Sequence, residues 1–328
     1  MIKKYLFSVL VSSCIAGTST AGTMGPVCDA LCAANNPGGF YLGITGIYGQ
    51  PSETGLGLVT DSWLYGNSAA AMAIGKPFDP NYKWLGIGKV GYDIPGTANN
   101  IEIDYLFLNN GTHSVNNFGD GSIGFGSILF PDVTIPFTPD FVSDALLQYK
   151  AGQVDAKIGR KYSDVSGVYY LRTSVGARWA ELKHSLLFAA PGNMISRFRG
   201  AGPLLSLDGR YGFSSGFGLV GSFDYGFIVG QANSHSYVRI AEKNYGFKWP
   251  KRNRVVNSLT GKLGIDFSYQ FSNLASITVE GGYQANEYFN AMDTIRGTIA
   301  FNGIQRINGL ETNDFSVQGP YISLTVHA

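Results

Sequence analysis

The residue types that most often carry out catalysis are sparse in this sequence of 328 residues. Its histidines are His113, His184, His235 and His327. They form no cluster with metal-ligand spacing, so we expect no metal site. The nearest acid–base pairings are His113 with Asp120 and His184 with Glu181, and solvated loop residues are the better interpretation of both, because general acid–base chemistry needs groups that converge in space. We therefore expect no enzyme, no catalytic residue and no cofactor.

Two glycine-rich stretches match the G-x-G-x-x-G pattern of dinucleotide-binding turns, Gly86–Gly91 and Gly119–Gly124. Such a turn has to follow a strand and open a helix. The first stretch lies inside an alternating strand pattern and the second inside a glycine-rich loop. With 44 glycines in the chain, matches of this kind arise by chance. The net charge of +1 likewise gives no field that would recruit nucleic acid.

Twelve charged residues stand out because each alternates with apolar or aromatic neighbours. They are Lys89, Asp93, Glu102, Asp104, Arg172, Arg178, Asp208, Arg210, Asp224, Lys262, Asp266 and Glu280. The clearest case is Leu259–Phe271, in which Leu263 and Ile265 share one face and Lys262 and Asp266 share the other. This run is longer than a soluble strand of about five or six residues. It suits a tilted strand that crosses a bilayer, which needs about 9–11 residues.

The direction of this alternation favours a membrane barrel. Aromatic residues make up 13% of the chain and charged residues only 14%. A soluble barrel would have to bury the whole aromatic face in its core, whereas a membrane barrel turns that face to lipid and keeps a polar interior. No run of 18 apolar residues follows the N-terminal segment, so helical spans are not expected. We predict that the twelve charged residues face the lumen of an all-β transmembrane barrel in the outer membrane.

Four hairpins and two single strands give an antiparallel up-and-down barrel of about ten strands. The single strands are Phe40–Tyr48 at the start and Tyr321–Ala328 at the end. Long segments rich in Gly, Asn and Pro separate the hairpins: 51–82, 109–143, 184–201, 231–254 and 288–314. We interpret them as extracellular loops, with short turns and both chain ends on the periplasmic side. Twelve strands would result if Ser122–Ile135 or Ile295–Ile307 formed a further hairpin.

The N-terminal residues predict export. Lys3 and Lys4 precede an apolar core, and Ser19 and Ala21 fit a signal-peptide cleavage site. We expect a signal peptide over 1–21, a periplasmic segment over 22–38 and the barrel over 39–328. Val11–Cys14 loosely resembles a lipoprotein cleavage box, which is the weaker fit.

Two cysteines remain in the expected mature chain, Cys28 and Cys32. In an oxidising periplasm they could pair with each other or across subunits, so a homo-oligomer stays open. The final strand alternates through Ile322, Leu324 and Val326 up to its last residue, as in strands that the barrel-assembly machinery recognises, although it ends in Ala328 and not in an aromatic residue.

Several segments resemble the Legionella-type major outer membrane protein family. They are Ala21–Cys28, Phe198–Pro203, Lys262–Gly264, Gly281–Tyr283, Tyr288–Ala291 and Val317–Tyr321. The resemblance implies an abundant pore-forming surface protein with Cys28 as a candidate for inter-subunit disulfide bonding.

From the residues we expect a passive channel for small hydrophilic solutes, whose lumen charges set its selectivity. Seven of the twelve charges are acidic and five basic, which predicts weak cation preference. The alternative is a non-conducting surface barrel that acts as an adhesin or structural protein, because charges paired across a narrow lumen would close it.

Overall fold

The computed structural model describes residues 38–54, 57–64, 71–77, 80–118, 124–129, 132–137, 141–164, 168–188, 192–213, 216–240, 243–271, 275–299 and 305–328. No helix in this part of the chain is long and apolar enough to span a membrane. The expected signal peptide and the cysteines Cys28 and Cys32 lie outside the described residues.

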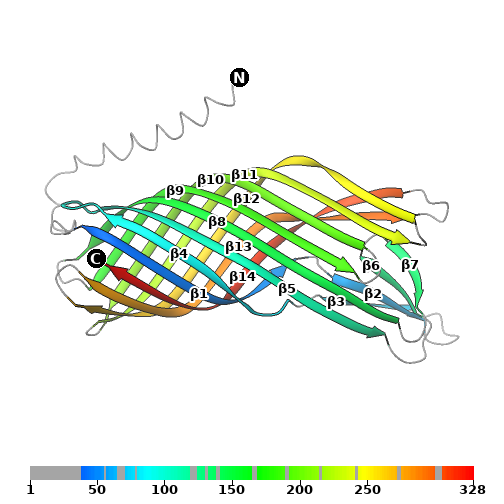
Figure 1. The fold of residues 1–328 in the computed structure, drawn as a ribbon, viewed down its shortest axis with the longest axis horizontal. Coiled ribbons are helices and arrows are strands. Elements are labelled where there is room, and N and C mark those ends of the chain that lie inside the picture. The colour runs from blue at the N-terminus through cyan, green and yellow to red at the C-terminus, as the bar shows by residue number, and fades with distance from the viewer. Residues whose placement is uncertain are drawn as a thin grey trace, which may run out of the picture.

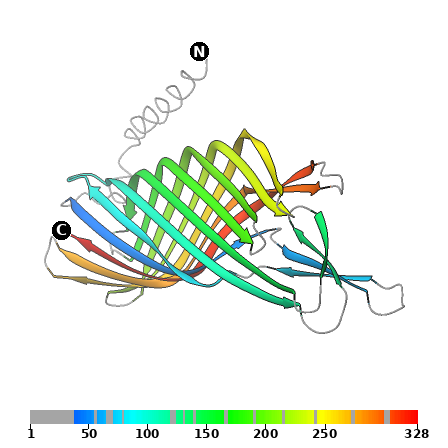
Figure 2. The ribbon, with the colours of Figure 1, turned by 45° about the vertical axis from the view of Figure 1, so that its right-hand side comes forward.

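Ten antiparallel strands form a closed barrel, as the sequence predicts (Figures 1 and 2). The strands are β1 (Gly39–Glu53), β4 (Lys83–Asp93), β5 (Asn99–Phe118), β8 (Phe141–Ser163), β9 (Tyr169–Phe188), β10 (Gly192–Gly212), β11 (Phe217–Ile240), β12 (Lys243–Gln270), β13 (Ser276–Ile299) and β14 (Gln305–His327). The last strand closes the barrel by pairing with the first, with Ile44 opposite Leu324. We call the end where β1 begins and β14 ends the terminal end, and the opposite end the hairpin end.

Four shorter strands form a separate sheet near the hairpin end (Figure 2). They are β2 (Gly57–Leu64), β3 (Ala71–Pro77), β6 (Gly124–Leu129) and β7 (Asp132–Phe137), in the order β3-β2-β6-β7. The further hairpin anticipated within Ser122–Ile135 therefore exists, but it joins this sheet and not the barrel. The one anticipated at Ile295–Ile307 adds no strand, because it is the end of the β13–β14 hairpin.

All five segments interpreted as long loops are mostly strand, and those at 51–82 and 109–143 supply the four strands of the separate sheet. Strand pairing covers much of 184–201, 231–254 and 288–314, so β11, β12 and β13 reach 24, 28 and 24 residues. A strand of this length extends roughly 80–90 Å at about 3.3 Å per residue, far more than the apolar band of about 25 Å requires even when tilted. The barrel therefore continues well beyond its membrane-spanning part.

The outer wall of the terminal half is apolar. Exposed residues there include Phe40, Leu42, Ile44, Ile101, Ile103, Tyr105, Leu171, Val175, Leu205, Leu207, Leu219, Phe223, Leu263, Ile265, Ile322 and Leu324. We call this surface the apolar belt. Aromatic pairs border it at the terminal end, among them Phe40–Tyr92 with ring centroids 4.7 Å apart and Phe217–Phe267 at 4.8 Å. An apolar wall with an aromatic border matches the lipid-facing surface of a membrane barrel.

Candidate functional site in the barrel lumen

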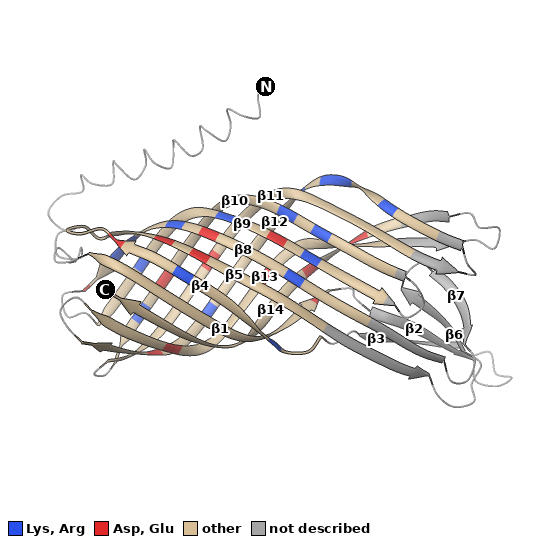
Figure 3. Cartoon of the chain, viewed as in Figure 1, with Lys and Arg blue, Asp and Glu red and all other residues tan. Residues whose placement is uncertain are grey.

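All twelve charged residues selected from the sequence project to the inside of the barrel, since they alternate with the exposed residues of the apolar belt. Several are nearly inaccessible: Glu102 is 2% exposed, Arg178 1% and Asp266 2%. Charges with so little contact with water need partners. Figure 3 shows that Asp and Glu gather in the half of the barrel nearer the C-terminus.

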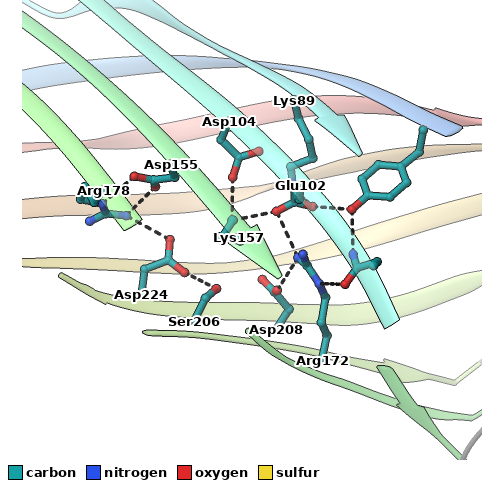
Figure 4. A network of polar contacts seen from close by, with 12 residues as sticks. Lys89, Glu102, Asp104, Asp155, Lys157, Arg172, Arg178, Ser206, Asp208 and Asp224 are labelled. Carbon is teal, nitrogen blue, oxygen red and sulfur yellow. Dashed lines mark hydrogen bonds and ion pairs between the residues drawn. The ribbon is translucent and has the colours of Figure 1, made fainter. Parts of the chain in front are cut away.

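Glu102 of β5 is the centre of the largest cluster (Figure 4). Its carboxylate accepts a hydrogen bond from Tyr41 at 2.9 Å and lies 2.7 Å from the ammonium of Lys157. Arg172 donates to it at 3.1 Å, and Lys89 lies 3.7 Å away. One acid thus has three basic neighbours, so the cluster needs more acids to approach neutrality.

Those acids come from β5 itself and from other strands. Asp104 lies 2.6 Å from the ammonium of Lys157, and Asp208 accepts from Arg172 at 3.1 Å. Closer to the terminal end, Asp93 lies 2.5 Å from Lys161. Charges from β4, β5, β8, β9 and β10 are therefore joined in one network across the lumen.

Arg178 of β9 centres a second cluster. It donates two parallel bonds to Asp155, at 2.9 and 2.8 Å, in the bidentate geometry that suits a guanidinium. It also donates to Ser258 at 3.0 Å and to Asp224 at 3.4 Å. Ser206 donates to the other oxygen of Asp224 at 2.5 Å.

Two further pairs complete the set on β10, β12 and β13. Arg210 donates to Asp266 at 2.6 Å, and Lys262 lies 2.8 Å from Glu280. Glu280 also accepts a hydrogen bond from Tyr321, whose ring lies beneath the Lys262 ammonium at 5.3 Å. Every one of the twelve predicted residues is thus in an ion pair. We call this whole set, with its partners, the charged belt.

Three members of the charged belt are not among the twelve predicted residues: Asp155, Lys157 and Lys161, all on β8. Their signal is present in the sequence, because Gln153, Asp155 and Lys157 alternate with Val154, Ala156 and Ile158. With these three, the belt has eight acids against seven bases, and its acidic excess falls from two to one.

Inward-facing glycines make room for the belt. A Cβ atom on Gly91 would lie 2.0 Å from the Tyr41 ring, and one on Gly264 would lie 2.3 Å from the Tyr321 hydroxyl. Both tyrosines therefore reach their glutamates by lying across a glycine. This use of glycine accounts for part of the high glycine content of the chain.

Beyond the belt, toward the hairpin end, the lumen is filled by apolar side chains from all ten barrel strands. They include Ile47, Leu85, Leu108, Leu147, Tyr149, Leu182, Leu186, Met194, Phe198, Ile228, Val256, Tyr288, Met292, Phe315 and Val317. We call this cluster the apolar plug. Phe198, Leu182 and Ile228 are completely buried. An aqueous passage would leave its lining side chains exposed, whereas the side chains of the apolar plug are buried.

Apolar residues of β8 also face the plug. Leu147, Tyr149 and Ala151 point inward and are 1%, 1% and 5% exposed. The lumen at this level is therefore apolar, in contrast to the charged belt.

His184 lies beside the plug and does not pair with Glu181. Its Nδ1 is 2.8 Å from Glu53, which also accepts a hydrogen bond from Tyr149 at 3.2 Å. Glu181 projects from the opposite face of β9 and pairs with Arg197 and Arg199. The side chains of His113 and Asp120 lie outside the described residues. Within the described part of the chain, no three His, Cys, Asp or Glu side chains are grouped to hold a metal ion.

The model of the family described as the Legionella pneumophila major outer membrane protein precursor matches residues 34–328. No curated protein matches the chain.

Solved outer-membrane barrels resemble the fold at low identity. The outer membrane protease OmpT from Escherichia coli is 12% identical over 89% of this chain and 98% of its own, with a TM-score of 0.48. A FadL homologue from Pseudomonas aeruginosa is 13% identical over 88% and 90%, with a TM-score of 0.31. The translocator domain of the autotransporter NalP from Neisseria meningitidis is 11% identical over 98% and 97%, with a TM-score of 0.33.

Proposed function

The chain belongs to the Legionella pneumophila major outer membrane protein family, and from this premise we propose that it is a surface barrel whose lumen is closed at rest. The protein would then act through its hairpin end, which lies outside the cell, as a structural or adhesive protein of the outer membrane. A permanently open diffusion pore, which the charge pattern first favours, needs a water-filled lumen.

The apolar plug carries this proposal. Its side chains come from every barrel strand and include large groups that are fully buried, such as Phe198, Phe315 and Met292. Protein interiors of this kind are packed as densely as organic crystals. Moving a hydrated solute through the plug would require these side chains to separate first.

The length of the strands supports a role at the surface. Strands of 20 residues or more continue past the apolar belt, and a second sheet of four strands lies near their ends. We place the hairpin end outside the cell, because short connections and both chain ends belong on the periplasmic side of such barrels. In this orientation residues 51–82 and 231–254 are extracellular.

Conductance and solute uptake test the closed lumen. The purified barrel, shown to be folded by its heat-modifiable migration on a gel, is placed in planar bilayers and in liposomes that contain a small sugar gradient. We expect no steady ion-permeable steps and no sugar-dependent swelling. Steady steps in the folded wild-type protein would overturn the proposal.

A second candidate is a gated ion passage, which the edge of the charged belt favours. The side chains of Lys89, Asp208 and Arg210 are 32%, 29% and 26% exposed, so the belt is hydrated on one side. The acidic excess of one predicts weak cation preference in any open state. If the barrel is a gated passage, the bilayer assay should show brief, voltage-dependent openings. Lys262→Gln should then raise the cation preference of the open state.

We also propose that the barrel is not an enzyme. His184 and Glu53 form a pair of the kind that hydrolases use, but both side chains are fully buried. A substrate bond could not reach them without opening the barrel.

The proposed partners are outer-membrane lipid, the barrel-assembly machinery acting on β14, small hydrophilic solutes for any gated state, and a second copy of the chain joined through Cys28 or Cys32.

A further inference from the structure

A row of positive charges crosses the outer wall directly above the apolar belt. It comprises Lys150, Lys183, Arg197, Arg199 and Lys248, which lie on β8, β9, β10 and β12. We call it the cation row. Lys150 is directly opposite Lys183, and Lys183 is directly opposite Arg197. Like charges at directly opposed positions destabilise a sheet. The folded barrel therefore holds these positive charges close together although they repel one another.

Acidic residues do not balance the row. The described outward side chains come from residues 148–154, 179–187, 193–201, 229–237 and 246–255. Among them Glu181 is the single acid, and it holds two of the five cations: Arg199 donates to it at 3.0 and 2.6 Å, and Arg197 donates to its other oxygen. Lys251 of β12 is also exposed in this stretch, so six cations share one carboxylate.

Two titratable groups report the local field. Partial burial raises the pKa of Glu181, but the hydrogen bonds from Arg199 and Arg197 outweigh that effect and hold the pKa below its usual value. His235, opposite Lys248 on the next strand, has a lowered pKa because of its partial burial and the charges of Lys183 and Lys248. The lowered pKa of Glu181 indicates positive potential at this part of the wall, and at His235 the two lysines add to the effect of burial on its pKa.

The height of the row on the barrel matters as much as its charge. Trp179, Val229 and Val255 are 37%, 52% and 46% exposed and mark the upper edge of the apolar surface on β9, β11 and β12. The row begins within two strand positions of this edge, since Arg199 is opposite Glu181, which lies two positions beyond Trp179. Lys183 lies four positions beyond Trp179, and Lys248 seven beyond Val255. Lipid headgroups occupy this level of a bilayer, and tryptophan is common there.

We propose that the cation row binds the phosphate groups of a phosphorylated glycolipid in the outer leaflet. Lys150 and Lys183 meet the phosphate as point charges, whereas Arg197 and Arg199 offer planar donor forks whose charge Glu181 partly neutralises. The bound phosphate removes the repulsion between Lys150, Lys183 and Arg197. The proposal rests on the orientation proposed above, because that orientation brings the row to the outer leaflet.

The test measures the affinity of the full-length folded barrel for lipopolysaccharide in detergent, with salt held constant. Lys150→Gln/Lys183→Gln removes two charges from the row. The control, Arg160→Gln, removes one outward charge at the terminal end of β8, away from the outer leaflet. At about fivefold for each basic residue near an anionic surface, we expect the row variant to bind roughly 25-fold more weakly. The control should bind like the wild type.

Three further binding measurements complete the test. Dephosphorylated lipopolysaccharide should bind the wild type as weakly as the phosphorylated form binds the row variant. Glu181→Gln should tighten binding, because it frees two arginines. Equal losses in the row variant and the control, or unchanged binding in both, would overturn the site, and equally tight binding of phosphatidylglycerol vesicles would overturn the glycolipid assignment. None of these outcomes depends on conductance, so the closed lumen stands or fails separately.

Discussion

The terminal half and the hairpin half of the barrel are built from the same strands with opposite sides apolar. On β9, Leu171 and Val175 face outward and Arg172 faces inward, whereas further along the strand Leu182 and Leu186 face inward and Lys183 faces outward. The same set of alternate positions faces outward along the whole strand, but the outward residues change from apolar to polar. The difference shows that the medium outside the wall, lipid below and water above, decides which face of a strand is apolar.

The same inversion explains why the two halves of the lumen hold different kinds of side chain. Where lipid takes the apolar face, the inner face is polar and fills the lumen with ion pairs around Glu102 and Arg178. Where water takes the polar face, the inner face is apolar and fills the lumen as a soluble core would, around Phe198 and Phe315. The charged belt and the apolar plug are thus two consequences of a single pattern.

The largest expected effect comes from breaking the charged belt at Arg178. Its side chain is fully buried, and Arg178→Met leaves the nearly inaccessible Asp155 without its cation. Removing one partner of a buried ion pair costs about 3–5 kcal/mol of stability. Urea unfolding followed by heat-modifiable migration measures the loss.

The control replaces the pair as a whole. Arg178→Met/Asp155→Leu turns this part of the belt into plug-like packing, and replacing a buried pair by apolar groups is often neutral. We expect the double variant to regain most of the lost stability. A double variant as unstable as the single one would mean that the belt cannot be exchanged for a plug, and the comparison would fail.

The barrel was predictable from the sequence because its period of two survives wherever lipid lies outside. Lys262 to Asp266 shows this, since a charge alternates there with Leu263 and Ile265. The hairpin half was mistaken for loops because its strands were expected to stay apolar outside and polar inside. Segments such as 231–254 have the opposite polarity and therefore did not match the expected pattern.

The charged residues of the site were predictable from the sequence, but their pairing and the apolar plug beside them were not. Twelve inward charges follow from strand phase, which is a local property. Their pairing depends on the register between strands far apart in the sequence, such as Lys161 with Asp93. The plug could not be predicted, because no local signal says that ten strands send residues such as Tyr149 and Leu182 to one level of the lumen.

A smaller effect should come from testing the two faces of β12 in the membrane-spanning half. Leu263 is 61% exposed in the apolar belt, and Leu263→Arg places a charge in lipid at a cost of roughly 2–4 kcal/mol near mid-bilayer. We expect impaired assembly, seen as loss of heat-modifiable migration. Its neighbour Lys262 faces the lumen, so Lys262→Gln should assemble normally. Normal assembly of Leu263→Arg with failure of Lys262→Gln would show that the faces are reversed.

The smallest effect tests how closely the belt is packed compared with the lipid-facing wall. Gly91 faces the lumen, and the Cβ of Gly91→Ala would lie 2.0 Å from the Tyr41 ring. Tyr41 would have to move and release Glu102, at about 1–3 kcal/mol for overpacking a filled site. Gly88, on the same strand but facing outward, has nothing within 4 Å of its added Cβ, so Gly88→Ala should unfold at nearly the wild-type urea concentration. Equal stability of the two variants would mean that Tyr41 moves freely and that the belt is less tightly packed than its hydrogen bonds indicate.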